Sequence, residues 1–133
     1  MSRKMLSLAL LAAVGLPLVV GCQFLLLRIC VKNDTPYFLD EFTVKASGDL
    51  TYPDGDLKNL PPGAAGTVRR LPAGTYDLRA QFDVADESVC EDTVELLSVE
   101  LENTNLCVTY ELQSTINRGE CDQEIYATLD YTL

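Results

Sequence analysis

The chain has 133 residues, and its 20 Asp and Glu against 10 Lys and Arg give a net charge of −10 at pH 7. Such an acidic surface repels phosphate backbones, which excludes nucleic acid as a favourable partner. The sequence has no His and no Trp. It therefore lacks the usual general base, the commonest metal ligand and one favoured platform for stacking sugars.

The N-terminal segment has the parts of a secretory signal peptide. Two basic residues, Arg3 and Lys4, precede the uncharged apolar run Met5–Val20. This run has 16 residues, whereas a membrane-spanning helix needs roughly 20. Pro17 also interrupts helix near the end of the run. We therefore expect residues 1–21 to be a removable signal-peptide helix and not a permanent transmembrane anchor.

The segment Val19-Val20-Gly21-Cys22 sharpens this expectation. It resembles the lipobox of bacterial lipoproteins, in which an apolar residue, a small or apolar residue and Gly or Ala precede an obligatory Cys. The resemblance implies that the Cys22 sulfur receives a diacylglycerol, that the chain is cut after Gly21, and that the new amino terminus can be acylated with palmitate. Each buried methylene adds roughly 0.8 kcal/mol to membrane affinity, so two or three acyl chains hold a protein firmly. The alternative is an ordinary signal peptide with an incidental Cys.

Removal of the signal peptide leaves residues 22–133, which we expect to form a single domain. The mature chain keeps 8 Lys and Arg and 20 Asp and Glu, a net charge of −12. In enteric bacteria an Asp after the lipidated Cys often signals retention in the inner membrane, and this chain has Gln23 there. The resemblance therefore favours an outer membrane, where the cell has one, with the domain facing the periplasm or the exterior.

Beyond Cys22 the sequence predicts short strands, because apolar and polar residues alternate over short runs. We expect strands at residues 24–32, 37–46, 67–71, 75–84, 93–101, 106–112 and 124–133. The inward-facing sets are Leu25, Leu27, Ile29 and Val31; Tyr76, Leu78, Ala80, Phe82 and Val84; Leu106, Val108, Tyr110 and Leu112; and Ile125, Ala127, Leu129 and Tyr131.

Gly, Pro, Asn and Asp mark the connections between these strands. We expect turns at 33–36, 71–74 and 102–105, an acidic turn at 85–92, a long loop at 47–66 and a polar loop at 113–123. The apolar alternation changes phase at Asp40-Glu41 and again between Leu96 and Leu97. Both positions are predicted to be β-bulges, because an extra residue in one strand shifts which side chains face inward.

Seven short strands with regular turns predict an all-β fold, an antiparallel β-sandwich. The segment Leu71-Pro72-Ala73-Gly74-Thr75-Tyr76 resembles the L-P-x-G-x-Y strand entry of bacterial immunoglobulin-like and transthyretin-like modules. That resemblance implies a sandwich but no particular activity, since such modules serve many roles.

The cysteine count agrees with lipidation at Cys22, because it leaves the even set Cys30, Cys90, Cys107 and Cys121. Exported proteins usually oxidise such sets to disulfides. If strands 93–101, 106–112 and 124–133 form a meander, Cys90 and Cys121 lie at one end of it and Cys107 at the other. Cys30 and Cys107 share the outward parity of their strands, so antiparallel neighbours could link them. We expect Cys30–Cys107 with Cys90–Cys121; the alternative is that one or both pairs stay reduced.

Three polar features could carry chemistry, and each also has a structural interpretation. Asp54-Gly55-Asp56 could contribute oxygens to calcium, but the next residues do not continue the ligand spacing, so a turn is favoured. The acidic residues around Cys90 fit a solvated hairpin tip. Arg69-Arg70 could dock an anionic partner, or could simply protect an edge strand from aggregation.

The sequence therefore predicts a membrane-anchored cell-envelope lipoprotein with a non-catalytic binding or structural role, and no cofactor. Its partners would be the membrane, through lipid, and an envelope protein or polysaccharide. One alternative is a carbohydrate- or calcium-binding module that uses the loop at 47–66 or the acidic tips. Another is a small hydrolase that relies on carboxylates, although no pair of acids stands out in the sequence.

Overall fold

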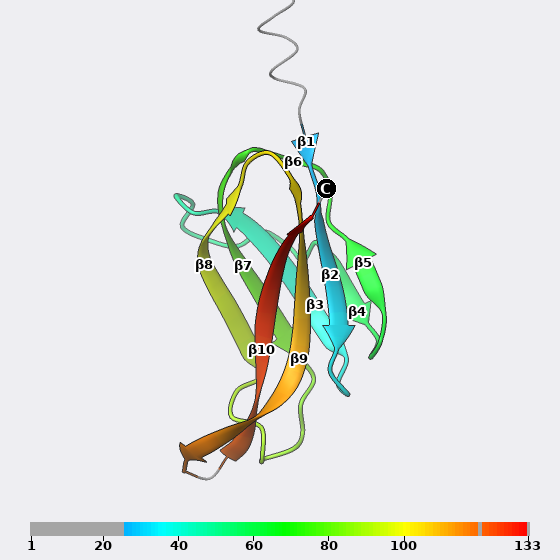
Figure 1. The fold of residues 1–133 in the computed structure, drawn as a ribbon, viewed down its shortest axis with the longest axis vertical. Coiled ribbons are helices and arrows are strands. Elements are labelled where there is room, and N and C mark those ends of the chain that lie inside the picture. The colour runs from blue at the N-terminus through cyan, green and yellow to red at the C-terminus, as the bar shows by residue number, and fades with distance from the viewer. Residues whose placement is uncertain (1–25, 120, 133) are drawn as a thin grey trace, which may run out of the picture.

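The computed structural model describes residues 26–119 and 121–132, and these residues form ten β-strands and no helix (Figure 1). The strands are β1 (Leu26–Leu27), β2 (Ile29–Asp34), β3 (Leu39–Ala46), β4 (Leu57–Leu60), β5 (Ala65–Thr67), β6 (Leu71–Pro72), β7 (Gly74–Phe82), β8 (Thr93–Leu101), β9 (Asn105–Arg118) and β10 (Cys121–Thr132). The predicted all-β class is confirmed.

Two four-stranded sheets face each other and form a β-sandwich (Figure 1). One sheet has the order β10-β9-β2-β5 and the other has the order β4-β3-β7-β8, while β1 and β6 form a separate short pair. Every pair of strands is antiparallel except β2 and β9, which are parallel. The predicted β-sandwich is confirmed, with ten strands in the described residues where seven were expected and with one parallel pair that the antiparallel prediction did not include. Because β2 and β9 are far apart in sequence, no hairpin turn forces them to run in opposite directions.

The core lies between the two sheets and follows the predicted alternation. In β7 the side chains of Tyr76, Leu78, Ala80 and Phe82 are buried, as expected. The ring of Tyr110 in one sheet packs edge-on against two rings of the other, with centroids 6.3 Å from Phe42 and 5.4 Å from Phe82. Such aromatic contacts stabilise the sandwich beyond the area that they bury.

Both predicted bulges are confirmed. The pairing of β3 with β7 shifts between Leu39 and Glu41, so Leu39 is fully buried whereas its neighbour Phe38 is 47% exposed. In β8 the register shifts opposite Tyr76 and Leu78, and Ser98 takes a φ of 58°. These bulges let each strand keep apolar residues facing the core on both sides of the irregularity.

The predicted boundaries between residues 47 and 74 were wrong. The expected long loop contains β4, which pairs with β3, and the start of β5, which pairs with β2. The expected strand at 67–71 is replaced by the end of β5 and the start of β6. The expected turn at 71–74 begins with β6, which pairs with β1. Strand pairing with distant segments outweighs the local turn preference of Gly and Pro here.

The C-terminal third differs from the sequence prediction in three ways. The predicted meander is wrong, because β8 lies in one sheet and β9 and β10 lie in the other. The predicted polar loop at 113–123 is instead a hairpin arm, in which β9 and β10 continue to pair. Leu129 and Tyr131 were expected to face inward but are 36% and 47% exposed, because β10 is the edge strand of its sheet.

The sandwich is elongated, and its two ends differ (Figure 1). β1, β6 and the C-terminal end of β10 lie at one end, which we call the proximal end because the described chain begins there with β1. The connection between β7 and β8 and the arm of the β9–β10 hairpin lie at the other, which we call the distal end. The part of the chain that the structure describes contains no helix long and apolar enough to cross a membrane.

Candidate functional site

The predicted lipidation residue Cys22 and the signal peptide at residues 1–21 lie outside the described residues. The four remaining cysteines are described, and they pair as Cys30–Cys107 and Cys90–Cys121. Both predicted disulfides are therefore confirmed.

Cys30 and Cys107 are register partners on β2 and β9, with their Cα atoms 4.4 Å apart. The prediction named this pair correctly but assumed antiparallel neighbours, whereas the two strands are parallel. Directly opposed residues on neighbouring strands project to the same face of a sheet, whether the strands are parallel or antiparallel. The outward orientation of both cysteines was therefore sufficient to predict the pair. The bond links two strands that lie 77 residues apart in sequence.

The second disulfide builds the distal end. It joins Cys90 in the connection 83–92, which we call the acidic loop, to Cys121 at the start of β10. The Ser88 carbonyl accepts hydrogen bonds from the Asp122 and Gln123 amides at 2.9 and 3.0 Å, and the Cys90 amide donates to the Gln123 carbonyl at 2.8 Å. Backbone hydrogen bonds and a covalent bond thus hold the loop against the edge of β10.

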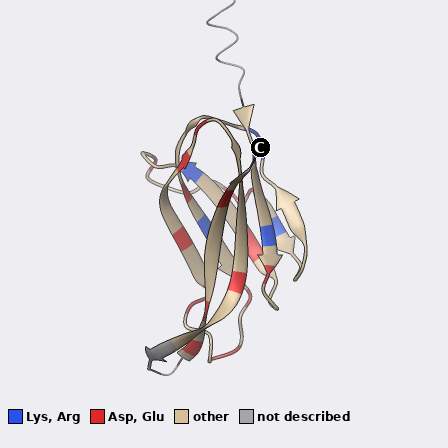
Figure 2. Ribbon diagram, viewed as in Figure 1, with Lys and Arg blue, Asp and Glu red and all other residues tan. Residues whose placement is uncertain are grey.

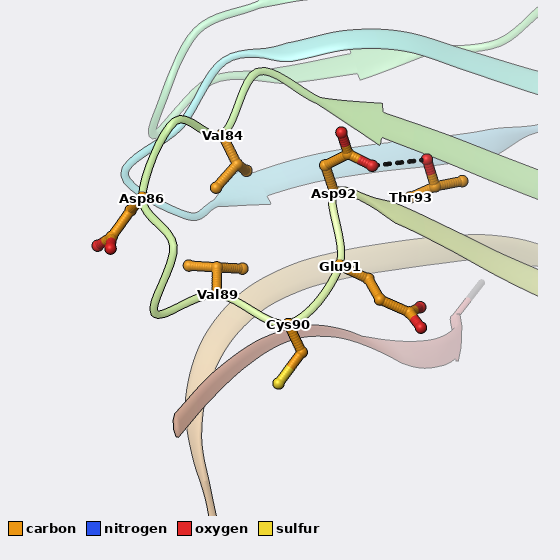
Figure 3. A pocket seen from close by; sticks show the side chains of 7 residues that line it. All are labelled: Val84, Asp86, Val89, Cys90, Glu91, Asp92 and Thr93. Carbon is orange, nitrogen blue, oxygen red and sulfur yellow. Dashed lines mark hydrogen bonds between the residues drawn. The ribbon is translucent and has the colours of Figure 1, made fainter. Parts of the chain in front are cut away.

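The acidic loop surrounds an open depression of about 440 Å³ (Figure 3). Val84 and Val89 point toward the inside of the loop, and Val89 is buried. Asp86 and Glu91 point away from the loop on opposite sides, and the Thr93 hydroxyl donates to the Asp92 carboxylate at 3.2 Å. Because the carboxylates diverge, they do not converge on a single cation. This arrangement fits the predicted solvated tip.

Two groups near this depression have shifted pKa values. The Ser88 amide donates to the Asp86 carboxylate at 2.9 Å, and this hydrogen bond is the main reason why the pKa of Asp86 lies below its usual value. Burial raises the pKa of the Tyr37 phenol, and the negative charge of Asp86 raises it further. Asp86 therefore stays ionised and Tyr37 stays neutral at physiological pH.

The segment Asp54-Gly55-Asp56 has a structural role in the fold. One Asp56 oxygen accepts a hydrogen bond from the Val44 amide at 3.0 Å, and the other pairs with the Arg69 guanidinium. The Asp56 carboxylate thus connects β3 to the segment that follows β5. These contacts also give Arg69 an intramolecular partner, which neither sequence interpretation of Arg69-Arg70 anticipated.

A second polar network lies where the loop between β3 and β4 meets β7 and β8, and the sequence did not reveal it. The Tyr52 hydroxyl donates to Glu95 at 2.7 Å, and the Arg79 guanidinium lies 4.3 Å from the Tyr52 ring centroid. Asp77 accepts hydrogen bonds from Ser47 and from the Ser98 amide and pairs with Lys45 at 3.1 Å. The alternation along β7 could show that Asp77 and Arg79 face away from the core. No local signal shows that the loop between β3 and β4 folds back over them.

Lys and Arg are confined to part of the described chain, whereas Asp and Glu occur throughout it (Figure 2). The acidic loop, β8 and β10 carry carboxylates and contain no Lys or Arg, whereas basic residues lie on β2, β3, β4 and β7. Among residues 26–119 and 121–132 there is no group of three or more His, Cys, Asp or Glu placed to hold a metal ion. The chemistry that the acidic side offers is attraction of positive charge.

No family model and no curated protein matches the sequence. Among solved structures, the chain is similar to a protein from Eubacterium rectale whose structure was determined by NMR. The two share 12% sequence identity over 76% of this chain and 86% of the other, with a TM-score of 0.51. Similarity at this level of identity shows the fold alone, so it supports the β-sandwich.

Proposed function

We propose that the chain is a bacterial cell-envelope lipoprotein that is anchored through Cys22 and has a non-catalytic binding or structural role. The lipobox resemblance of Val19-Val20-Gly21-Cys22 motivates the anchor. Two disulfides in a small domain are typical of a protein exported to an oxidising compartment.

The observation that carries this proposal is the position of β1. This strand begins at Leu26, only four residues after Cys22, and it lies at the proximal end of the sandwich (Figure 1). A lipid on Cys22 would therefore hold the proximal end next to the bilayer. The acidic loop and the hairpin arm would then point away from the membrane, where a partner in the envelope could reach them.

The test is expression of the full chain in a bacterial host, followed by membrane fractionation and mass spectrometry of the N-terminal peptide. We expect wild type in the membrane fraction with an acylated N-terminal Cys22. Cys22→Ser should lose the acyl mass. Gln23→Ala, which changes the neighbouring residue but keeps the lipobox, should behave as wild type. A wild-type protein that still begins at Met1, or one with an unmodified Cys22, would contradict the proposal.

A further inference from the structure

The long edge of β10 differs from the other three sheet edges of the sandwich. Exposed edges usually carry features that prevent pairing with another chain, such as short length, Lys, Pro or a bulge. β5 has three residues and is soon followed by Arg69-Arg70, β4 has four residues including Lys58, and β8 contains the Ser98 bulge. β10 has 12 residues and contains neither Lys nor Pro, and its register shift with β9, between Cys121 and Gln123, lies at the end that the acidic loop covers.

The chain itself shows which backbone groups of β10 point outward. Val89 forms a parallel bridge with Gln123, in which the Gln123 amide donates to Ser88 and its carbonyl accepts from Cys90. Both backbone groups of Gln123 therefore point away from β9. From Gln123 onward the pairing of β10 with β9 has no register shift. In an antiparallel pair this direction repeats at every second residue, so the N–H and C=O groups of residues 125, 127, 129 and 131 also point outward.

Two depressions lie along this edge, one toward each end of β8. The first, of about 170 Å³, lies between Glu95 on β8 and Ile125 on β10. The second, of about 330 Å³, lies between Glu100, Glu102 and Tyr131. Exposed Leu129 and Tyr131 supply apolar surface between and beside them. The side of the sandwich between β8 and β10 is therefore recessed next to an unpaired strand edge.

The charge of this side decides which kind of strand could bind there. β8 and β10 together carry Glu95, Glu100, Asp122, Glu124 and Asp130 and no basic residue. A second copy of the same edge would bring like charges together, which destabilises a strand pair. A strand with Lys or Arg side chains would instead meet opposite charges on both sides of the recess.

We infer that residues 125–131 of β10, together with β8, form a docking site for an extended basic segment of a partner protein. The partner adds a strand to the sheet by main-chain hydrogen bonds, and its cationic side chains contact the carboxylates along the recess. The inference rests on the binding role proposed above but not on the lipid anchor, so it can fail while acylation of Cys22 stands.

The test uses the purified full chain in neutral detergent and a fluorescent peptide of alternating Lys and Val as the probe. We expect saturable binding that weakens as salt is added, and no binding of a peptide in which Glu replaces each Lys. Hydrogen exchange should slow at the outward amides of residues 125–131 when the basic peptide is present. A basic peptide that fails to bind, or that leaves these amides unprotected, would overturn the inference.

Two variants at one position separate backbone pairing from side-chain contact. Leu129→Pro removes an outward N–H without removing a hydrogen bond to β9, and should weaken peptide binding by about tenfold or more. Leu129→Ala keeps the N–H and loses only the apolar side-chain contact, so it should weaken binding less than Leu129→Pro does. Circular dichroism melts check that Leu129→Pro is folded. The double substitution Asp130→Lys with Glu100→Lys tests the charge contribution, and it should also weaken binding of the basic peptide. Equal binding by all variants, or dimerisation of the chain through β10 that the peptide does not displace, would overturn the inference.

Discussion

Asn33 is a fully buried polar residue at which several segments of the chain meet. Its side-chain amide donates to the carbonyls of Tyr37 and Leu60 at 2.8 and 3.0 Å, and its side-chain oxygen accepts from the Thr35 hydroxyl at 2.7 Å. Its backbone pairs with Gly63 and Ala64. Asn33 therefore fixes the connection from β2 to β3 against the loop between β4 and β5.

Removal of this side chain should be costly. We expect Asn33→Ala to lower the free energy of unfolding by about 2–4 kcal/mol, because the buried carbonyls and the Thr35 hydroxyl lose their partner. Urea denaturation measures this change. Asn103→Ala, at an exposed position in the turn before β9, should change stability by less than about 0.5 kcal/mol. Equal effects of the two substitutions would show that the hydrogen bonds of Asn33 contribute little.

Asp77 makes the stability of the fold depend on pH. The pKa of its carboxyl lies below the usual value, chiefly because the Ser98 amide donates to it and then because Ser47 and Lys45 contact it. A carboxylate with a lowered folded-state pKa stabilises the fold above its unfolded-state pKa, and this contribution is lost as the pH falls through the folded-state value.

We therefore expect Asp77→Asn to lower the melting temperature near pH 7, and the difference from wild type to shrink below about pH 4. Thermal melts across this range test the expectation. Asp83→Asn, at an exposed position just after β7, is the matched control and should melt close to wild type near pH 7. A difference between Asp77→Asn and wild type that stays constant into strong acid would contradict the assignment, because protonated Asp77 and Asn are both neutral.

At the scale of elements, the two disulfides stabilise different parts of the fold: Cys90–Cys121 stabilises one loop, and Cys30–Cys107 stabilises the centre of a sheet. The first fixes the acidic loop to β10, and the second joins two central strands. We expect the double substitution Cys90→Ser with Cys121→Ser to speed hydrogen exchange at residues 88–90 while the amides of β2 and β9 stay protected. In the chain-entropy model the loss of this bond costs about 3–4 kcal/mol of stability.

The double substitution Cys30→Ser with Cys107→Ser is the matched comparison for this experiment. It should speed exchange across both central strands, because the bond lies between register partners of the sheet. If exchange at 88–90 were unchanged after loss of Cys90–Cys121, the backbone hydrogen bonds to Gln123 alone would account for the order of the loop.

Elements with strong apolar alternation were predictable from sequence, and elements formed by distant partners were not. The buried face of β7 and both bulges follow from which side chains must avoid water, and that information is local. β4, β5 and β6 lie in segments rich in Gly and Pro, and they form strands because β3, β2 and β1 offer them hydrogen-bonding partners. The hairpin arm was missed for a different reason: its partners are close in sequence, but the polar residues of 113–118 carry no apolar alternation.

The candidate site shows the same limit. Cysteine number and parity were sufficient to predict both disulfides, yet the parallel pairing of β2 and β9 was not encoded in either strand. The sequence showed that this connection is acidic. It did not show that the connection attaches to β10, because that contact depends on how the sheets pack. The loop that covers Asp77 and Arg79 could not be predicted either, because Tyr52 lies 43 residues before the Glu95 to which it donates a hydrogen bond.

At the scale of the whole molecule, the elongated shape gives the proposed lipid anchor a consequence that can be measured. Only residues 23–25 separate Cys22 from β1, so an anchored chain should hold its proximal end near the bilayer and its acidic distal end farther out. Repulsion between the acidic loop and anionic lipid would favour the same orientation. A long flexible linker would have allowed the domain to tumble freely.

Energy transfer to an acceptor lipid in vesicles tests this orientation, with a single fluorophore attached to the acylated protein. Ala73→Cys places the label beside β6 at the proximal end, and Glu87→Cys places it in the acidic loop at the distal end (Figure 1); both positions are exposed. We expect stronger transfer from position 73 than from position 87, and background transfer from both when Cys22→Ser is added. Equal transfer from the two positions would mean that the sandwich lies flat on the membrane or tumbles above it, and the distal end would then have no privileged access to a partner.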